Sequence, residues 1–270
     1  MDKNKKIGFA VIGYGGMGSW HASTCADDFK DTAELIGIYD IKPERRAAAE
    51  AEGIHAFSSR EELLADERID LVTVATPNDV HKEIAIAAMA AGKNVISEKP
   101  VALSQEELEE MIAASKKYGK LFTVHQNRRW DPDFKCVQKI LADNELGKVF
   151  RIESRVQGSR GIPGDWRNQK AHGGGMVLDW GIHLLDQALR IGEGRKLRVT
   201  LIFEGDLSMY VEVTTSNFIE LPRWYVLGEN GSAVINDWDL NGEIVKVSDW
   251  ENRDAVPILA GVGLTKTMAP

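Results

Sequence analysis

The sequence has 270 residues, 43% of them hydrophobic, which is enough for two packed domains with separate cores. Its 33 basic and 41 acidic residues give a net charge of −8, which excludes the basic surface typical of proteins that bind nucleic acid or anionic membranes. No apolar run reaches the roughly 18 to 20 residues that span a bilayer, and the N-terminus has no signal-peptide core. We therefore expect a cytoplasmic protein with a small-molecule partner.

The first part of the chain alternates short apolar runs with helix-compatible segments, a pattern typical of a parallel sheet covered by helices on both faces. Strands are predicted over residues 7–12, 33–40, 54–57, 69–75, 94–98 and 121–125. Helices are predicted over residues 17–29, 43–52, 60–65, 79–91 and 104–118. Two of these helices begin with a capping box, formed by Ser59 with Glu62 and by Ser104 with Glu107. Residues 1–125 are thus predicted to form an α/β domain.

Beyond residue 126 the alternation is lost. Helices are predicted over residues 132–143 and 176–190. Strands are predicted over residues 149–157, 198–204, 207–213, 223–227, 232–235 and 243–247, with turns at 204–206, 228–231 and 239–242. Residues 126–270 are therefore predicted to form an α+β domain with a mostly antiparallel, open sheet.

A glycine-rich motif, GYGGMG at residues 13–18, lies where the first predicted strand ends and the first helix begins. Gly13 permits a tight turn, Gly15 lets the backbone approach a pyrophosphate, and Gly18 lets the helix pack against the strand. The helix N-terminus offers amide donors and a positive dipole to phosphates. The alternative is that these glycines serve only the turn. The motif predicts cofactor contacts from Gly13, Gly15, Gly16, Met17 and Gly18.

Asp40 ends the second predicted strand, about 20 residues after the motif, where a carboxylate accepts hydrogen bonds from an adenosine ribose. Its presence favours the dinucleotide site over the turn alone. A carboxylate there repels a 2′-phosphate, so we predict NAD as the cofactor. Arg45 and Arg46 lie close enough to leave NADP open, although on a helix start they are more simply solvated charges.

Two further loops follow predicted strands and therefore face the ligand crevice of a parallel sheet. In TPNDVH at residues 76–81, Asn78 or Asp79 is alternatively an ordinary N-cap and His81 a first-turn residue. In EKP at residues 98–100, a partly desolvated lysine beside a cationic ring has a lowered pKa suited to proton transfer. A surface lysine before a proline turn is the simpler alternative. The two loops predict cofactor contacts from Thr76, Pro77, Asn78, His81, Glu98 and Lys99.

The sequence GGGMVLDWGIHLLDQ at residues 173–187 places Asp179 and His183 four residues apart on one face of a predicted helix. Taken alone, such a pair is usually a surface contact. No metal site is predicted, because no third ligand accompanies the pair. Three consecutive glycines before a helix indicate that some group approaches the backbone closely.

Together these four motifs resemble the Gfo/Idh/MocA family, which includes glucose-fructose oxidoreductase and inositol dehydrogenase, over nearly the whole chain. The resemblance implies an NAD(P)-binding Rossmann domain over residues 1–125 and a substrate and oligomerisation domain over residues 126–270. It also implies hydride transfer between nicotinamide and a carbinol carbon of a sugar, glycoside or cyclic polyol such as inositol. A homo-oligomer formed through the second-domain sheet is expected.

By this resemblance, Lys99, Asp179 and His183 match the catalytic positions of the family. His183 would relay the proton of the substrate hydroxyl, Lys99 would polarise that oxygen or share the transfer, and Asp179 would orient both. Which of Lys99 and His183 is the base stays open. The segments of this chain that contain Asn127, Arg128, Trp166 and Arg167 resemble family segments that line the entrance to the cofactor and substrate site. The alternative is that these four residues form a polar rim at the junction of the two domains.

The chain departs from the family in its length, because relatives commonly carry about 60 to 100 more residues. The second domain is therefore expected to be shortened. Two other functions remain open at this stage. One is a noncatalytic NAD-binding regulator, against which the joint presence of Lys99, Asp179 and His183 argues. The other is an imine or tetrapyrrole reductase, which would not need the Asp/His pair.

Overall fold

The computed structural model describes residues 6–157, 165–191, 201–202, 207–214, 219–246, 257–260 and 263–266. The chain divides into two compact units. The first comprises Met1–Arg129, Gln157–Gln187 and Val213–Phe218, and the second comprises Trp130–Val156, Ala188–Glu212 and Ile219–Pro270. The segment that carries Asp179 and His183 thus groups with the first unit, although it follows residue 125 in the sequence. Among the described residues, no helix is long and apolar enough to cross a membrane.

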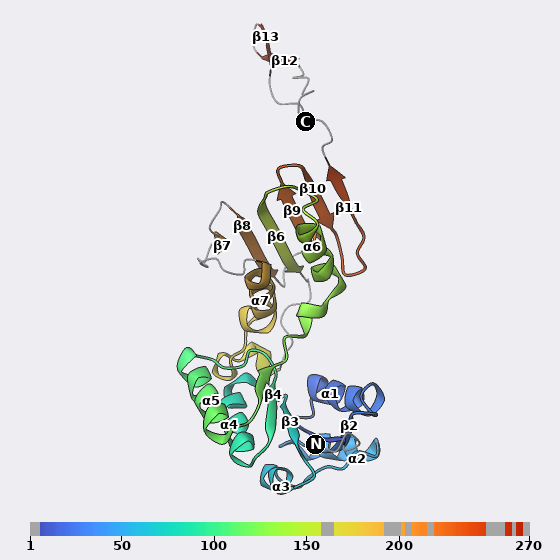
Figure 1. The fold of residues 1–270 in the computed structure, drawn as a ribbon, viewed down its shortest axis with the longest axis vertical. Helices are drawn as coiled ribbons and strands as arrows, with labels where there is room; N and C mark the ends of the chain where they lie inside the picture. The colour runs from blue at the N-terminus through green and yellow to red at the C-terminus, as the bar shows by residue number, and fades with distance from the viewer. Residues whose placement is uncertain are drawn as a thin grey trace. The chain divides into compact units, whose positions relative to one another are not determined.

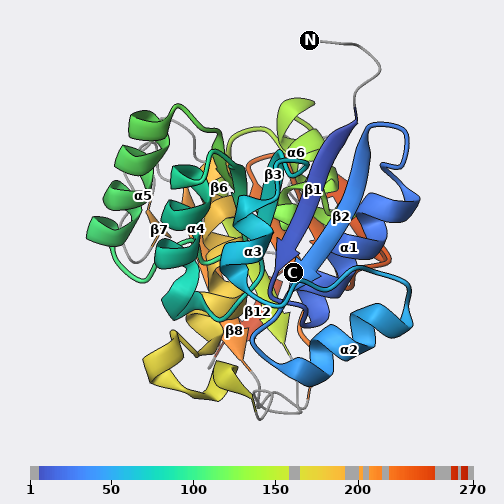
Figure 2. The same ribbon diagram turned by 90° about the horizontal axis from the view of Figure 1, so that it is seen from below.

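The first unit contains a parallel sheet of five strands in the order β2-β1-β3-β4-β5 (Figures 1 and 2). The strands are β1 (Ile7–Ile12), β2 (Ala33–Tyr39), β3 (Leu71–Val74), β4 (Asn94–Ser97) and β5 (Phe122–Val124). The order reverses between β1 and β3, and ligands bind at such a point, outside the carboxyl ends of the strands. The Rossmann-like α/β fold predicted for this part of the chain is confirmed.

Helices cover both faces of this sheet. They are α1 (Gly16–Asp27), α2 (Pro43–Ala51), α3 (Arg60–Ala65), α4 (His81–Ala90) and α5 (Gln105–Tyr118). Alternate residues of β1 belong to different cores: Ala10 and Ile12 pack with α3, α4 and α5, whereas Phe9 and Val11 pack with α1 and α2. Figure 1 shows α4 and α5 together beside β3 and β4. The continuous apolar runs of the strands follow from this burial on both faces.

The predicted capping boxes are present. Ser59 Oγ accepts from the amide of Glu62 at 3.0 Å, and Ser104 Oγ accepts from the amide of Glu107 at 3.2 Å. One strand prediction is wrong: residues 54–57 do not form a strand and contribute only an isolated bridge between Ile38 and Ala56. The segment is too short to extend this pairing, because α2 ends just before it and α3 begins just after it.

In the second unit a six-stranded sheet has the order β11-β10-β9-β6-β8-β7. Its strands are β6 (Val149–Gln157), β7 (Leu201–Ile202), β8 (Ser208–Thr214), β9 (Trp224–Gly228), β10 (Gly231–Ile235) and β11 (Gly242–Lys246). The strand pairs β6–β9, β9–β10, β10–β11 and β7–β8 are antiparallel, so the predicted sheet type is confirmed. The predicted hairpin at residues 228–231 joins β9 to β10. The turn predicted at 204–206 lies outside the described residues.

Helix α6 (Pro132–Ala142) packs against this sheet through a buried polar contact as well as apolar ones. Asp133 accepts from Trp224 Nε1 at 2.7 Å and pairs with Arg223 Nε at 2.5 Å. The Phe134 and Trp224 rings stack with centroids 6.1 Å apart. A further small hairpin pairs β12 (Pro257–Ala260) with β13 (Gly263–Lys266).

Candidate active site

The glycine motif lies at the carboxyl end of β1, where the strand order reverses. Gly13 has a φ of +96°, and a Cβ there would lie 2.6 Å from the carbonyl oxygen of Ala75, which follows β3. A Cβ on Gly18 would lie 1.7 Å from the carbonyl oxygen of Gly13. These two glycines are therefore required by the fold itself, as the motif predicts.

For Gly15 and Gly16, no close contact with the described residues requires glycine. A Cβ on Gly15 would make only ordinary contact, with the Arg45 guanidinium at 3.5 Å, and a Cβ on Gly16 would meet no described atom within 4 Å. Gly15 is the N-cap of α1 and supplies no side-chain cap. Among the described residues no side chain caps the first amides of α1, and these amides lie at a glycine-lined surface that fits the pyrophosphate of a dinucleotide.

Asp40 lies beside this turn and is 3% exposed. Its carboxylate accepts from the amide of Tyr14 at 2.7 Å and from the amide of Lys42 at 2.9 Å. Arg45 also donates to it at 3.0 Å, and the Arg45 side chain is 41% exposed. The acid predicted to bind ribose therefore also holds the glycine turn, and a partly exposed cation lies next to it.

The loop after β3 holds the glycine-rich segment of residues 173–175 in place. Asn78, in the 3₁₀ turn η1 (Asn78–Val80), donates from Nδ2 to the carbonyl of Gly173 at 2.9 Å. A Cβ on Gly173 would lie 3.1 Å from Asn78 Cβ, so the close approach indicated by the glycines comes from the protein itself. His172 pairs with Asp79 at 2.9 Å across the same junction.

His81 is fully buried, and both ring nitrogens face backbone carbonyls, those of Pro100 and Thr76, each at 3.0 Å. Burial lowers the pKa of His81 despite these contacts. The ring ties the loop after β3 to the loop after β4. Neither nitrogen is left over for a ligand, so any contribution of His81 to the cofactor site is indirect.

Lys99 and Asp179, which are 80 residues apart in the chain, are in direct contact. Lys99 Nζ donates to the Asp179 carboxylate at 2.9 Å and to the Asp179 backbone carbonyl at 2.7 Å. An ammonium has three donors, so one remains for a substrate oxygen. The second carboxylate oxygen of Asp179 lies 3.5 Å from Arg167 Nε. Both side chains of the pair are less than one-fifth exposed.

The helix predicted from Met176 begins differently from the prediction. Residues Val177–Gly181 form a π-helical turn (η5), and α7 (Ile182–Ile191) follows. The α-helical start predicted at Met176 is therefore wrong, and a π turn, which holds more residues than an α turn, carries Asp179 and precedes His183. Single π turns are frequent at functional sites.

His183 is 5% exposed, and its Nδ1 has no hydrogen-bond partner among the described residues. Burial, together with the positive charges of Lys99 and Arg128, lowers the pKa of His183 to about 3. The ring is therefore neutral at physiological pH, and one of its nitrogens carries a free lone pair. Trp180 packs against it edge-on, with ring centroids 6.0 Å apart.

The remaining predicted residues lie on short 3₁₀ turns. Arg128, on η2 (Asn127–Trp130) with Asn127, stacks over Trp180 at 4.8 Å. Arg167, on η3 (Trp166–Asn168), stacks over Trp166 at 4.6 Å and reaches Asp179 as described. Two arginines thus flank the Lys99–Asp179–His183 group.

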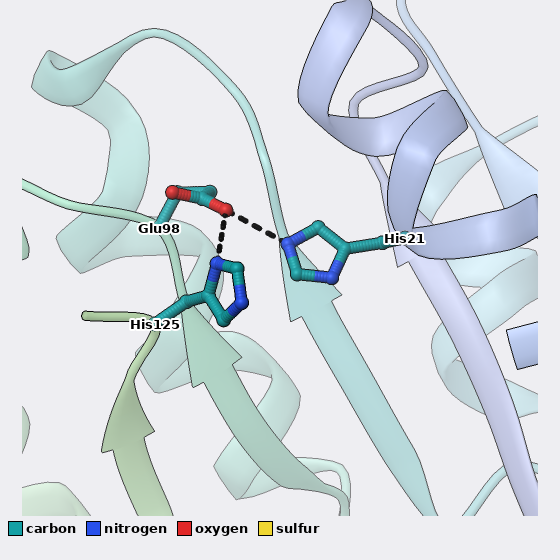
Figure 3. A group of neighbouring side chains, drawn as sticks. All are labelled: His21, Glu98 and His125. Carbon is teal, nitrogen blue, oxygen red and sulfur yellow. Dashed lines mark hydrogen bonds and ion pairs between the residues drawn. The ribbon is translucent and has the colours of Figure 1, made fainter. Parts of the chain in front are cut away.

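A second polar cluster contains the neighbour of Lys99 (Figure 3). Glu98 Oε1 lies 2.7 Å from His21 Nε2 and 2.9 Å from His125 Nδ1. Burial acts to raise the pKa of Glu98, but the hydrogen bonds and charges of His125 and His21 hold it well below its usual range. We refer to His21, Glu98 and His125 as the His–Glu–His cluster.

Neither His21 nor His125 was among the site residues predicted from the sequence. A signal for both exists: His21 shares the inner face of α1 with Gly18, Ala22 and Cys25 at helical spacing, and His125 directly follows β5, beside the end of β4. The three-ligand group that seemed missing from the sequence therefore arises around Glu98 and not around Asp179.

Two family models match this chain. Residues 7–126 match the oxidoreductase family with an NAD-binding Rossmann fold, and residues 134–204 match the GFO/IDH/MocA C-terminal domain. In structure the chain resembles an NAD-binding protein from Listeria innocua, with 46% identity and a TM-score of 0.85, covering 90% of this chain and 77% of that one.

Curated relatives match over a smaller share of their length. The chain is 34% identical over 192 residues to the uncharacterised oxidoreductase YdgJ of Escherichia coli K12, covering 71% of this chain and 54% of that protein. It is 32% identical over 190 residues to scyllo-inositol 2-dehydrogenase (NADP(+)) IolW of Bacillus subtilis 168, covering 69% and 51%. The chain therefore spans about half the length of these curated relatives.

Proposed function

This chain belongs to the Gfo/Idh/MocA family of oxidoreductases, and we propose that it transfers a hydride between NAD(P) and a carbinol carbon of a sugar, glycoside or cyclic polyol. The observation that carries the proposal is the contact of Lys99 with Asp179 beside the neutral, partly unpartnered ring of His183. Family relatives that are named as sugar or polyol dehydrogenases support this class of substrate.

Three residues divide the work on the substrate hydroxyl. Lys99, held by Asp179, donates its remaining N–H to the hydroxyl oxygen and stabilises the negative charge that develops there. His183, uncharged before reaction, accepts the hydroxyl proton as general base. Asp179 orients Lys99 and balances its charge. The bound nicotinamide supplies the hydride acceptor, and Gly15, the N-terminus of α1 and Asp40 would hold its dinucleotide.

The same contacts leave the cofactor choice between NAD and NADP to experiment. Asp40 favours a free ribose 2′-hydroxyl, whereas Arg45 is exposed enough to turn toward a 2′-phosphate. Because IolW is named as an NADP(+) enzyme, the affinities of this protein for NAD and for NADP should both be measured. A homo-oligomer also stays a prediction, which light scattering on the purified protein would test.

A screen of sugars, glycosides and inositols for NADH or NADPH formation, measured by absorbance, tests the proposed reaction. Turnover of at least one such carbinol supports it. Binding of NAD(P) without turnover of any of them would instead support the noncatalytic regulator.

Calorimetry with Gly15→Ala tests the dinucleotide site separately. The new Cβ makes only ordinary contacts within the protein, so unfolding should change little, yet it stands where the pyrophosphate must approach. We expect the affinity for NAD(H) to fall at least about tenfold. Unchanged affinity would place the cofactor elsewhere.

A further inference from the structure

We propose that the His–Glu–His cluster is a binding site for one divalent transition-metal ion, with Zn²⁺ as the best match. Three donor atoms, His21 Nε2, Glu98 Oε1 and His125 Nδ1, lie within 4.8 Å of one another. Figure 3 shows the two rings and the carboxylate converging from three separate parts of the chain. Two imidazoles and one carboxylate form an established ligand set for zinc.

The cluster needs only a small expansion to hold an ion. Zinc lies about 2.0 to 2.2 Å from nitrogen and carboxylate oxygen, so tetrahedral ligands stand about 3.3 Å apart. The observed separations from Glu98 Oε1 are 2.7 Å to His21 and 2.9 Å to His125. Glu98 Oε1 would therefore move slightly away from both rings, while the two ring nitrogens, which lie within 4.8 Å of each other, would adjust to the same spacing. His125, 21% exposed, has the freedom to make this adjustment and gives the ion a route in.

Each donor group can present a lone pair to an ion. Glu98 Oε1 already faces both ring nitrogens, so its lone pairs point into the space between the three groups. Each imidazole carries its hydrogen on either ring nitrogen, so moving it to the outer nitrogen frees the inner one for the metal. The ion would then replace the two hydrogen bonds that now join the rings to Glu98.

The surroundings also suit a metal site. The second oxygen of Glu98 accepts from the amide of Lys99 at 3.2 Å, which fixes the carboxylate as outer contacts fix metal ligands. Trp20 covers both rings, with centroids 5.1 and 5.6 Å away. An ion would tie α1 to the ends of β4 and β5, and a fourth position would stay open to water.

Titration calorimetry of tag-free, chelator-treated protein with ZnCl₂ tests the site. We expect one ion per chain, a rise in melting temperature, and a loss of affinity of more than about tenfold in His125→Gln and Glu98→Gln. His172→Gln is the matched control, because His172 also pairs with a carboxylate, that of Asp79, but has no third donor. Its zinc affinity should equal that of the wild type.

Co²⁺ provides a second readout that does not depend on stability. Visible absorption bands of bound Co²⁺ should appear in the wild type and His172→Gln, and should be lost in His125→Gln. Thermal melts without metal identify any cluster variant that has failed to fold. If one of His125→Gln and Glu98→Gln fails to fold, the zinc affinity of the other variant tests the proposal. The proposal is overturned if zinc produces neither heat nor a melting shift in the wild type, or if affinity is lost in His172→Gln and kept in the cluster variants.

Discussion

Glu98 and Lys99 follow each other after β4, but their side chains enter two clusters that differ in how fully their polar atoms are satisfied. Glu98 accepts from both His21 and His125 as well as from a backbone amide. Beside Lys99, by contrast, the buried Nδ1 of His183 has no hydrogen-bond partner among the described residues. A buried polar atom left unsatisfied costs free energy, so the second cluster leaves a hydrogen-bonding position open for a polar substrate group.

The electrostatics of the two clusters differ in the same way. Both pKa values are lowered, but the consequences are opposite: Glu98 is kept charged by two neighbouring rings, whereas His183 is kept uncharged by burial and neighbouring cations. A charged, fully paired group stabilises the structure locally. Burial and the nearby ammonium of Lys99 keep the His183 ring neutral, so its nitrogens remain available for hydrogen bonding to a substrate hydroxyl.

The largest effect should come from removing the proton acceptor. His183→Ala or Lys99→Ala should lower kcat by about 10²- to 10⁴-fold, because a positioned proton-transfer group contributes that much, while NAD affinity changes little. Asp179→Asn should cost less, because the amide oxygen still accepts from Lys99. Steady-state kinetics on the substrate found by screening measures all three. An alanine variant with unaltered kcat would remove the catalytic assignment.

The pH dependence of stability sharpens the contrast. The folded-state pKa of His183, about 3, lies below the unfolded value near 6.5, so between these values only the unfolded chain takes up the proton. Stability is therefore fully present above about pH 6.5 and falls on acidification, by at most about 1.4 kcal/mol per pH unit for this one group. The pKa of His81 is also lowered by burial, so this residue makes stability fall on acidification in the same way.

Urea unfolding between about pH 6.5 and 5.5 measures this slope above the range in which most carboxylates titrate. In His183→Asn the slope should become shallower. If the wild type and the variant lose stability in parallel, the ring of His183 is not held neutral in the folded state.

Local patterns in the sequence predicted much of the fold, because they report local physics. Short apolar runs predicted the strands of the first sheet, and Ser59 and Ser104 marked two helix starts that the structure confirms. The π turn at Val177–Gly181 was missed, since it depends on how the segment packs and not on its own propensities. The partners of Glu98 were missed because strand order, which places β5 beside β4, is a nonlocal property.

Glu98→Gln should destabilise the protein more than Asp179→Asn, which is a direct test of the contrast between the clusters. Glu98 is 5% exposed, and the amide of Gln weakens two charge-assisted hydrogen bonds, at a cost of about 2 kcal/mol. Asp179 is partly exposed, and its loss of charge should cost less than about 1 kcal/mol. Denaturant unfolding at neutral pH gives both values. Equal destabilisation would show that the two acids have similar structural roles.

The smallest expected effect is that of a chelator on turnover. Hydride transfer to nicotinamide requires no metal, and the described residues around Lys99 supply one carboxylate and one imidazole, short of the three ligands of a catalytic zinc. The proposed ion lies in the His–Glu–His cluster, where it acts on stability. EDTA should therefore lower the melting temperature of zinc-loaded protein and leave kcat nearly unchanged. If EDTA abolished turnover and zinc restored it, while His125→Gln kept this dependence, the ion would have to bind at Asp179 and His183 instead.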